Sequence, residues 1–176
     1  MYAGIMLVSS HNCLISNNTF SSNKQHGIFL THSSSNNISK NNISDNTYYG
    51  ITFDTSNNNT IFWNSINSNK NIGIYIHSSS NNNTVLSNNI KENGNIKGLG
   101  GSILLDRSSN NKIHRNNFIN NVKCAYFFDC TSNNWNGNYW DKPRLFPKII
   151  LGRKIGIIWW PWFNFDWHPA KEPYDI

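Results

Sequence analysis

The sequence predicts an all-β fold, a right-handed parallel β-helix (solenoid) of about five to six coils with an aromatic-rich C-terminal cap. Three observations carry this prediction: a repeat of 23 residues, apolar residues at fixed places in each repeat, and asparagines at two further fixed places. A repeat of this length is too short for a strand–helix–strand unit, and its apolar residues are too dispersed for an amphipathic helix. Three short strands joined by turns fit it, and stacking such coils makes each repeated position a column along the axis.

The repeat begins with a Gly-Ile pair at Gly4, Gly27, Gly50 and Gly73. Because side chains alternate across a strand, the second and fourth positions of each unit are expected to point inward, and the first, third and fifth outward. The small first residue suits a close approach of backbones at a turn. The four apolar columns are Ile5, Ile28, Ile51, Ile74 and Ile103; Leu7, Leu30, Phe53, Ile76 and Leu105; Ile15, Ile38, Ile61, Val85 and Ile113; and Phe20, Ile43, Ile66, Ile90 and Phe118.

The two polar columns consist of asparagine in five successive units. Serine- and asparagine-rich tracts usually indicate loops or disorder, but a residue that recurs at one place in every coil indicates ordered structure. Asparagine tolerates left-handed backbone, and its amide can bond both its own turn and the asparagine of the next coil. We therefore expect two asparagine ladders, Asn18, Asn41, Asn64, Asn88 and Asn116, and Asn23, Asn46, Asn69, Asn93 and Asn121.

Two regions follow from the repeat: β-helix repeats at residues 1–141, with a sixth unit beginning at Ala125, and a C-terminal capping segment at residues 142–176. The second region holds all five prolines. An open solenoid end exposes core and strand edges, so we expect the aromatic residues of this segment to pack on the last coil. The alternative is a membrane-interface or partner surface, since mixtures of Trp, Lys and Arg also suit the bilayer boundary. No cap precedes the first unit, which indicates a truncated β-helix or a partner paired at that end.

Composition excludes several classes of function. The net charge is +6, but the basic residues are scattered singly, so a nucleic-acid partner is not expected. No apolar run is long enough for a membrane span, and the first ten residues do not form a recognisable signal peptide. The cysteines, Cys13, Cys124 and Cys130, lack metal-ligand spacing, and no cofactor or metal site is predicted.

The outward positions supply the candidate site. The third position holds Met6, Phe29, Thr52, Tyr75, Leu104 and Phe127, and the fifth holds Val8, Thr31, Asp54, His77, Asp106 and Asp129. The candidate catalytic residues are Asp54, Asp106 and Asp129, and the candidate ligand-binding residues are Phe29, Tyr75, His77, Arg107 and Phe127.

Carboxylates one coil apart suit a retaining glycosidase, and carboxylates two coils apart suit an inverting one. An aspartate beside a basic residue could instead abstract a proton from a uronic acid, as a lyase does. Without catalysis, the aromatic side chains could stack on sugar rings. The simplest alternative is a solvated polar column with no chemistry.

The units "GIFLTHSSSNNISKNNISDN" and "GIYIHSSSNNNTVLSNNIKEN" resemble the NosD-like β-helix repeat proteins, above all their archaeal, asparagine-rich branch, and "NNWNGNYWD" looks like the element that closes such arrays. The resemblance implies an exported protein of a superfamily that includes carbohydrate-binding proteins, polysaccharide lyases and hydrolases, and epimerases. Our leading hypothesis is a non-catalytic surface or extracellular module that recognises a carbohydrate or protein partner. The alternatives are a polysaccharide lyase or glycoside hydrolase that uses the outward aspartates, and a periplasmic copper-handling protein like NosD.

Overall fold

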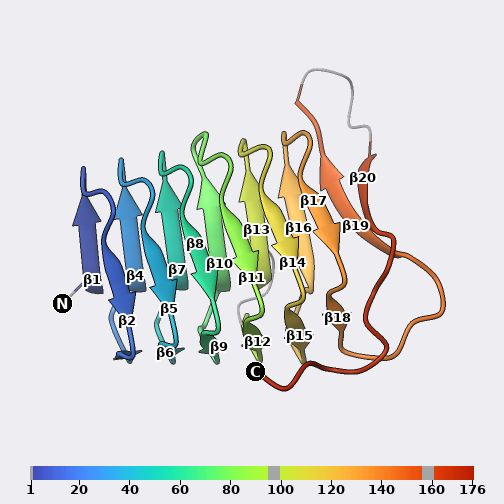
Figure 1. The fold of residues 1–176 in the computed structure, drawn as a ribbon, viewed down its shortest axis with the longest axis horizontal. Coiled ribbons are helices and arrows are strands. Elements are labelled where there is room, and N and C mark those ends of the chain that lie inside the picture. The colour runs from blue at the N-terminus through green and yellow to red at the C-terminus, as the bar shows by residue number, and fades with distance from the viewer. Residues whose placement is uncertain (1, 95–99, 156–160) are drawn as a thin grey trace.

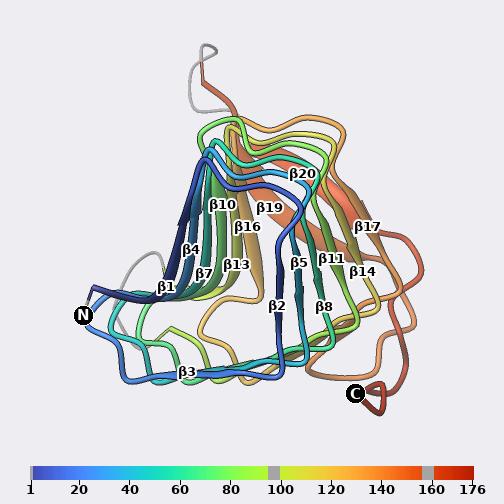
Figure 2. The same cartoon turned by 60° about the vertical axis from the view of Figure 1, so that its left-hand side comes forward.

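The computed structural model describes residues 2–94, 100–155 and 161–176. The chain is a right-handed parallel β-helix in which six coils each contribute one strand to each of three parallel sheets (Figure 1). In a view turned toward the axis, the backbones of successive coils lie one behind another and follow the same path (Figure 2). No helix in the described residues is long and apolar enough to cross a membrane.

The first sheet has the longest strands, and the second and third have strands of two or three residues. The first sheet comprises β1 (Ala3–Val8), β4 (His26–Thr31), β7 (Tyr49–Asp54), β10 (Ile72–His77), β13 (Gly101–Asp106) and β16 (Ala125–Phe128). The second comprises β2 (Leu14–Ser16), β5 (Asn37–Ser39), β8 (Thr60–Phe62), β11 (Thr84–Leu86), β14 (Lys112–His114) and β17 (Asn134–Asn136). The third comprises β3 (Thr19–Ser21), β6 (Asn42–Ser44), β9 (Ser65–Asn67), β12 (Asn89–Lys91), β15 (Asn117–Ile119) and β18 (Tyr139–Trp140).

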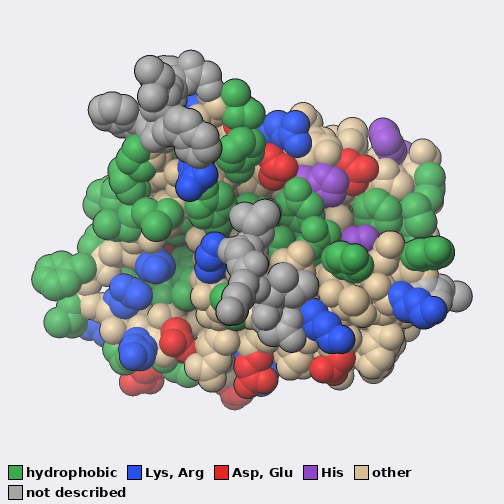
Figure 3. Space-filling view, turned by 180° about the vertical axis from the view of Figure 1, so that it is seen from behind, with side chains coloured by type: hydrophobic (Ala, Val, Ile, Leu, Met, Phe, Trp, Pro, Cys, Tyr) green, Lys and Arg blue, Asp and Glu red, His purple; other side chains and the backbone are tan. Residues whose placement is uncertain are grey.

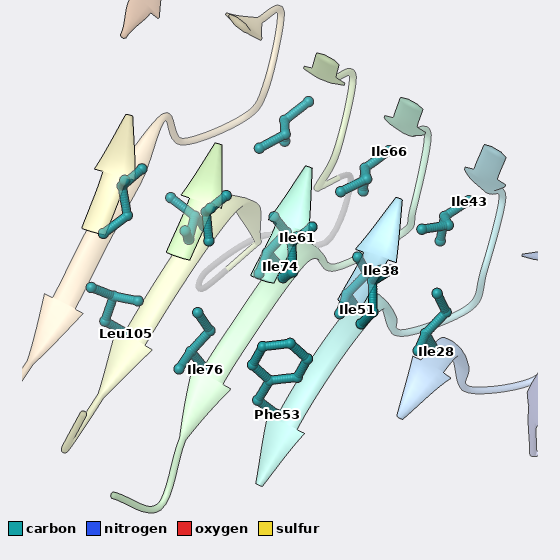
Figure 4. Packing of buried hydrophobic residues seen from close by; sticks show 14 of the residues in the cluster. Ile28, Ile38, Ile43, Ile51, Phe53, Ile61, Ile66, Ile74, Ile76 and Leu105 are labelled. Atoms are coloured by element: carbon teal, nitrogen blue, oxygen red, sulfur yellow. The ribbon is translucent and has the colours of Figure 1, made fainter. Parts of the chain in front are cut away.

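The predicted apolar columns form the core. Ile28 pairs with Ile51, and Ile51 with Ile74, so that identical side chains stack along the axis (Figure 4). All three are fully buried, as are Leu30 and Phe53 in the next inward column. This burial confirms the inward direction of the second and fourth positions.

The first position does not point outward, and that part of the prediction is wrong. A Cβ atom at Gly50 would lie 2.8 Å from Cγ2 of Ile66, in the core, and 2.6 Å from the carbonyl oxygen of Gly73. The preceding residues point outward instead, as the ring contact between Tyr49 and Tyr75 shows. Alternation fails here because the chain turns from the third sheet into the first. The close backbone approach that the small residue permits is confirmed.

The asparagine ladders are present and buried. Asn41 donates to Oδ1 of Asn64 through both its backbone N and its Nδ2, each at 3.0 Å, and Nδ2 also reaches the carbonyl of Ile15 at 2.9 Å. The same bonds recur from coil to coil. A third ladder of Asn36, Asn59, Asn83, Asn111 and Asn133 runs beside them. The sequence pattern missed it because Cys13 occupies that position in the first coil.

The sequence suggested that the ladder asparagines adopt the left-handed conformation. In the structure, the residues just before them adopt it instead. Lys40, Trp63 and Arg115 each have φ of 55° and precede Asn41, Asn64 and Asn116. A left-handed conformation costs roughly 1–2 kcal/mol in a residue with a side chain. The ladder hydrogen bonds offset this cost, because the turn aims each amide at its neighbour along the axis.

The turn that leads into the sixth coil, after Asn121, is one residue shorter than the sequence alignment assumed. Its ladder bonds join residues 22 apart, from Asn111 to Asn133 and from Asn116 to Asn138. Phe127 therefore pairs with Leu105 and is fully buried, and Phe128 pairs with Asp106. The outward assignment of Phe127 is wrong, because its ring fills the inward column.

The C-terminal segment forms a hairpin of β19 (Lys148–Arg153) and β20 (Pro161–Asp166). The expected packing of its aromatic residues on the last coil is wrong for Phe146, Trp162, Phe163 and Trp167, which are exposed. β19 continues the first sheet beside β16, β20 meets β17, and the two strands pair antiparallel across the end of the solenoid. Ile150 is buried against the core, and Gly152 lies on the ring of Phe127.

Asp166 ends the ladder of Asn116 and Asn138. Its buried carboxylate accepts bonds from the backbone N of Gly137, the backbone N and Nδ2 of Asn138, Nε1 of Trp140 and the backbone N of His168, at 2.9–3.2 Å. The remaining chain returns along the third sheet. There Tyr174 exchanges two hydrogen bonds with Asn117.

Candidate functional site

The outward side of the first sheet brings together aromatic, acidic and histidine side chains. We call this surface the acid–aromatic face. Acidic, histidine and hydrophobic side chains adjoin one another on the side of the molecule seen in Figure 3. The face comprises His26, Phe29, Tyr49, Asp54, Tyr75, His77, Asp106 and Arg107.

The rings of the face form a continuous row across three coils. His26 lies 5.2 Å from Phe29 and 5.3 Å from Tyr49 between ring centroids, and Tyr49 lies 5.1 Å from Tyr75. Tyr75 stacks on His77 at 4.4 Å and 20°. Of the predicted ligand-binding residues, Phe29, Tyr75 and His77 thus belong to one row. The sequence reasoning missed His26 and Tyr49, whose signal was an aromatic side chain just before the glycine in two successive coils.

Asp106 is held by two neighbours. It accepts a bond from the hydroxyl of Tyr75 at 3.2 Å and two from Arg107, from Nε at 3.1 Å and Nη2 at 3.4 Å. Its side chain is 15% exposed, and that of Arg107 is 58% exposed. The arginine and the tyrosine fix the carboxylate, and one of its sides still faces solvent.

Asp54 lies in a hydroxyl-rich setting. Thr31 and Thr55 donate to its carboxylate at 3.4 and 3.2 Å. Nδ1 of His77 lies 3.7 Å from Oδ1 of Asp54, whereas the same nitrogen lies 2.8 Å from the hydroxyl of Ser78. The shorter distance identifies Ser78 as the hydrogen-bond partner of His77.

Burial lowers the pKa of His77, and this outweighs the opposing effect of Asp54 and Asp106; Arg107 lowers it further. The pKa of His26 is also lowered, mainly by burial and then by His77. Both imidazoles are therefore neutral at pH 7. The pKa of Tyr75 is raised, first by burial and then by the negative charge of Asp106, so its hydroxyl remains a donor.

Asp129 lies outside the column of Asp54, His77 and Asp106. Because the turn into the sixth coil is one residue shorter, Phe128 occupies the place beside Asp106, and Asp129 follows it in a left-handed turn with φ of 47°. The predicted set of three column aspartates is therefore wrong and reduces to Asp54 and Asp106. These lie on β7 and β13, two strand spacings or about 10 Å apart along the axis.

An open hollow of about 550 Å³ adjoins the row of rings at the N-terminal end of the solenoid. Its walls include Met6, His26 and Phe29, together with Tyr2 and Gln25. Neither Asp54 nor Asp106 lines it. The two carboxylates are partly exposed on the outward side of the first sheet, at 29% for Asp54 and 15% for Asp106.

Among the described residues, no group of three or more His, Cys, Asp or Glu side chains lies close enough to hold one metal ion. The cysteines have other contacts: Cys130 accepts a bond from the backbone N of Ser108, and the backbone N of Cys13 donates to Asn36.

Fold and site together define the chain as a parallel β-helix protein with an acid–aromatic face on its longest sheet. Residues 1–145 match the family described as "Periplasmic copper-binding protein (NosD)". The chain belongs to the NosD family. The match is to the family as a whole and does not single out the archaeal, asparagine-rich branch that the sequence suggested.

Solved structures show the same fold. A crystal structure of a mutant of the periplasmic alginate epimerase AlgG aligns with a TM-score of 0.73 and 20% identity, over 89% of this chain and 36% of that one. A double mutant of AlgG aligns with a TM-score of 0.69 and 19% identity, over 97% of this chain and 44% of that one. The chain thus spans less than half the length of these structures. A comparison with curated proteins finds none that matches.

Proposed function

We propose that this chain is a non-catalytic, extracytoplasmic recognition module that binds a neutral polysaccharide along the acid–aromatic face. The observation that carries the proposal is the continuous row of His26, Tyr49, Tyr75 and His77 with a carboxylate on each side of His77. Flat rings offer apolar area to the faces of sugars, and fixed carboxylates accept bonds from sugar hydroxyls. The word "periplasmic" in the family description supports a location outside the cytoplasm.

The charge of the face favours a neutral ligand over a uronate polymer. Asp54 and Asp106 supply two negative charges, Arg107 supplies one positive charge, and the two histidines are neutral at pH 7. The face thus has a net charge of −1 and repels carboxylated sugars.

The arrangement supports binding better than catalysis. The carboxylate of Asp106 already accepts bonds from Tyr75 and Arg107, which leaves it less free to contact a glycosidic oxygen. Neither carboxylate lines the open hollow, and active sites usually exclude water. The enzyme alternative has one observation in its favour: Asp54 and Asp106 are about 10 Å apart, close to the separation in inverting glycosidases. The alginate epimerase of similar fold also favours the enzyme alternative, because it is an enzyme that acts on a uronate polymer.

The test is a binding screen of the purified chain against neutral and uronate polysaccharides, with each hit assayed for release of reducing ends and of unsaturated uronate. We expect binding of a neutral polymer without turnover, weakened about tenfold by Tyr75→Ala because one stacking partner is lost. Trp63→Ala is the matched control, since Trp63 is an exposed aromatic outside the face. Turnover that Asp106→Asn abolishes would establish the enzyme alternative. Retention of stoichiometric copper through dialysis, weakened by His77→Ala, would instead support a copper-handling function.

A further inference from the structure

The outer side of the cap hairpin is the largest group of exposed apolar side chains that the acid–aromatic face does not include. Leu151 is 55% exposed, Phe163 46% and Ile149 49%, and in the adjoining segments Leu145 is 88% and Trp167 62% exposed. Cross-strand pairing puts Leu151 opposite Phe163 and Ile149 opposite Phe165, so these side chains share one side of the hairpin. We call this the cap surface. Hydrophobic side chains cover much of the cap end in Figure 3.

The cap hairpin has apolar side chains on its outer side, although only its inner side closes the core. Its inner side buries Ile150 and lays Gly152 on Phe127. An antiparallel pair with one solvated side normally has polar residues there. The outer side instead has Ile149, Leu151 and Phe163, which indicates that it meets another apolar phase.

Most of the charge in this segment is positive, although Asp129 and Asp141 lie beside it. Residues 142–165 contain five cations and no acidic residue: Lys142, Arg144, Lys148, Arg153 and Lys154. Asp166, the first acidic residue that follows, is buried beneath the hydrogen bonds described above. Lys154 lies over the ring of Trp162 at 5.2 Å, and Lys148 over that of Trp140 at 5.8 Å. The cap surface is therefore both apolar and cationic.

This charge argues against a second copy of the chain as the occupant. Two cap surfaces face to face would oppose five cations with five. The N-terminal coils also lack complementary charge, because no acidic residue precedes Asp45 in the sequence. We propose that the cap surface binds the interface of an anionic lipid membrane, with Leu151, Phe163 and Trp167 entering the headgroup boundary and the exposed Lys142 and Lys154 facing lipid phosphates. The solenoid would then stand with its cap end on the membrane.

The experiment is co-sedimentation of the full chain with vesicles of phosphatidylcholine alone and of phosphatidylcholine with about one quarter phosphatidylglycerol. We expect binding to the anionic vesicles only, with a loss of at least about tenfold between 0.05 and 0.5 M salt, because salt screens the cations. Leu151→Ser with Phe163→Ser should reduce binding to the level on phosphatidylcholine alone. Met6→Ser with Val8→Ser is the matched control, since these exposed apolar residues lie in β1 at the other end.

A second variant guards against a cap that fails to fold. Lys142→Gln with Lys154→Gln changes only exposed side chains and should weaken anionic-vesicle binding by about tenfold, with an unchanged melting temperature. Absence of binding to anionic vesicles would overturn the proposal, as would equal binding by the apolar double variant and the control. A concentration-dependent dimer that the same apolar variant abolishes would assign the cap surface to self-association and would also overturn it.

Discussion

Asn64→Ala is the sharpest test of the ladder. In the third of six coils, Oδ1 of Asn64 accepts two bonds from Asn41, and its Nδ2 donates to the carbonyls of Ile38 and Phe62 and to Oδ1 of Asn88, all between 2.9 and 3.1 Å. Alanine removes all five bonds. The backbone N of Asn41 then loses its acceptor in a dry interior, where an orphaned donor costs about 1–3 kcal/mol, and each other bond contributes about 1 kcal/mol net.

Three of the affected groups keep other partners: the carbonyl of Phe62 still accepts from the backbone N of Lys40, Nδ2 of Asn41 still reaches Ile15, and Oδ1 of Asn88 still accepts from the backbone N of residue 64. We therefore expect a loss of about 3 kcal/mol in the free energy of unfolding, or a fall in Tm of about 6–12 °C for a chain of this size. Urea titration followed by circular dichroism measures it. Asn37→Ala is the control, since Asn37 is exposed on β5 and outside the ladders; it should change stability by less than about 0.5 kcal/mol. Equal Tm values for the two variants would refute the ladder account.

Two further predictions concern pH and the corner glycines. Because the pKa values of His26 and His77 are lower in the folded chain than the usual 6.5, the unfolded chain takes up protons first, so stability is full above about pH 6.5 and falls as the pH drops below it. His26→Gln with His77→Gln should flatten this dependence in urea titrations at about pH 5 and 7.5, and an unchanged slope would place the acid sensitivity elsewhere. Gly50→Ala should lower the free energy of unfolding by about 1–3 kcal/mol or more, because its Cβ would lie 2.6 Å from the carbonyl oxygen of Gly73. An unchanged thermal midpoint would show that the turn into the first sheet has room for a methyl group.

The core was predictable because repetition confirms each position several times. Ile28, Ile51 and Ile74 lie one repeat apart and stack on one another. Because the same apolar residue recurs in successive coils, the side of the strand that faces the core can be assigned from the sequence. The ladders of Asn41 and Asn64 were visible for the same reason. The ladder through Asn36 was not, since a single cysteine in the first coil broke its pattern.

The acid–aromatic face was predictable in part. Asp54, His77 and Asp106 follow from strand alternation, which holds in the middle of the long strands. His26 and Tyr49 lie where the chain bends into the first sheet, and alternation cannot be carried through a bend.

The sixth coil was misaligned because Tyr126, Phe127 and Phe128 are three successive aromatic residues. Either register puts an aromatic ring inside, so hydrophobicity alone does not choose between them. The ladder spacing of 22 residues decides, and it is evident only once Asn133 and Asn138 are seen to bond.

The ladders also give the solenoid a direction of growth. Between successive ladder asparagines, the backbone N and Nδ2 of one residue donate to Oδ1 of the next one toward the C-terminus, whereas Nδ2 also donates back to a carbonyl of the preceding coil. The Oδ1 acceptors therefore all receive their ladder bonds from the N-terminal side. Asp166 receives the last donors and, as a carboxylate, has none to pass on. Asp166 therefore ends the ladder that contains Asn138. A coil inserted between existing coils could repeat the ladder bonds, but no asparagine can extend this ladder beyond Asp166. The length of this one ladder is thus the number of asparagines that precede the aspartate.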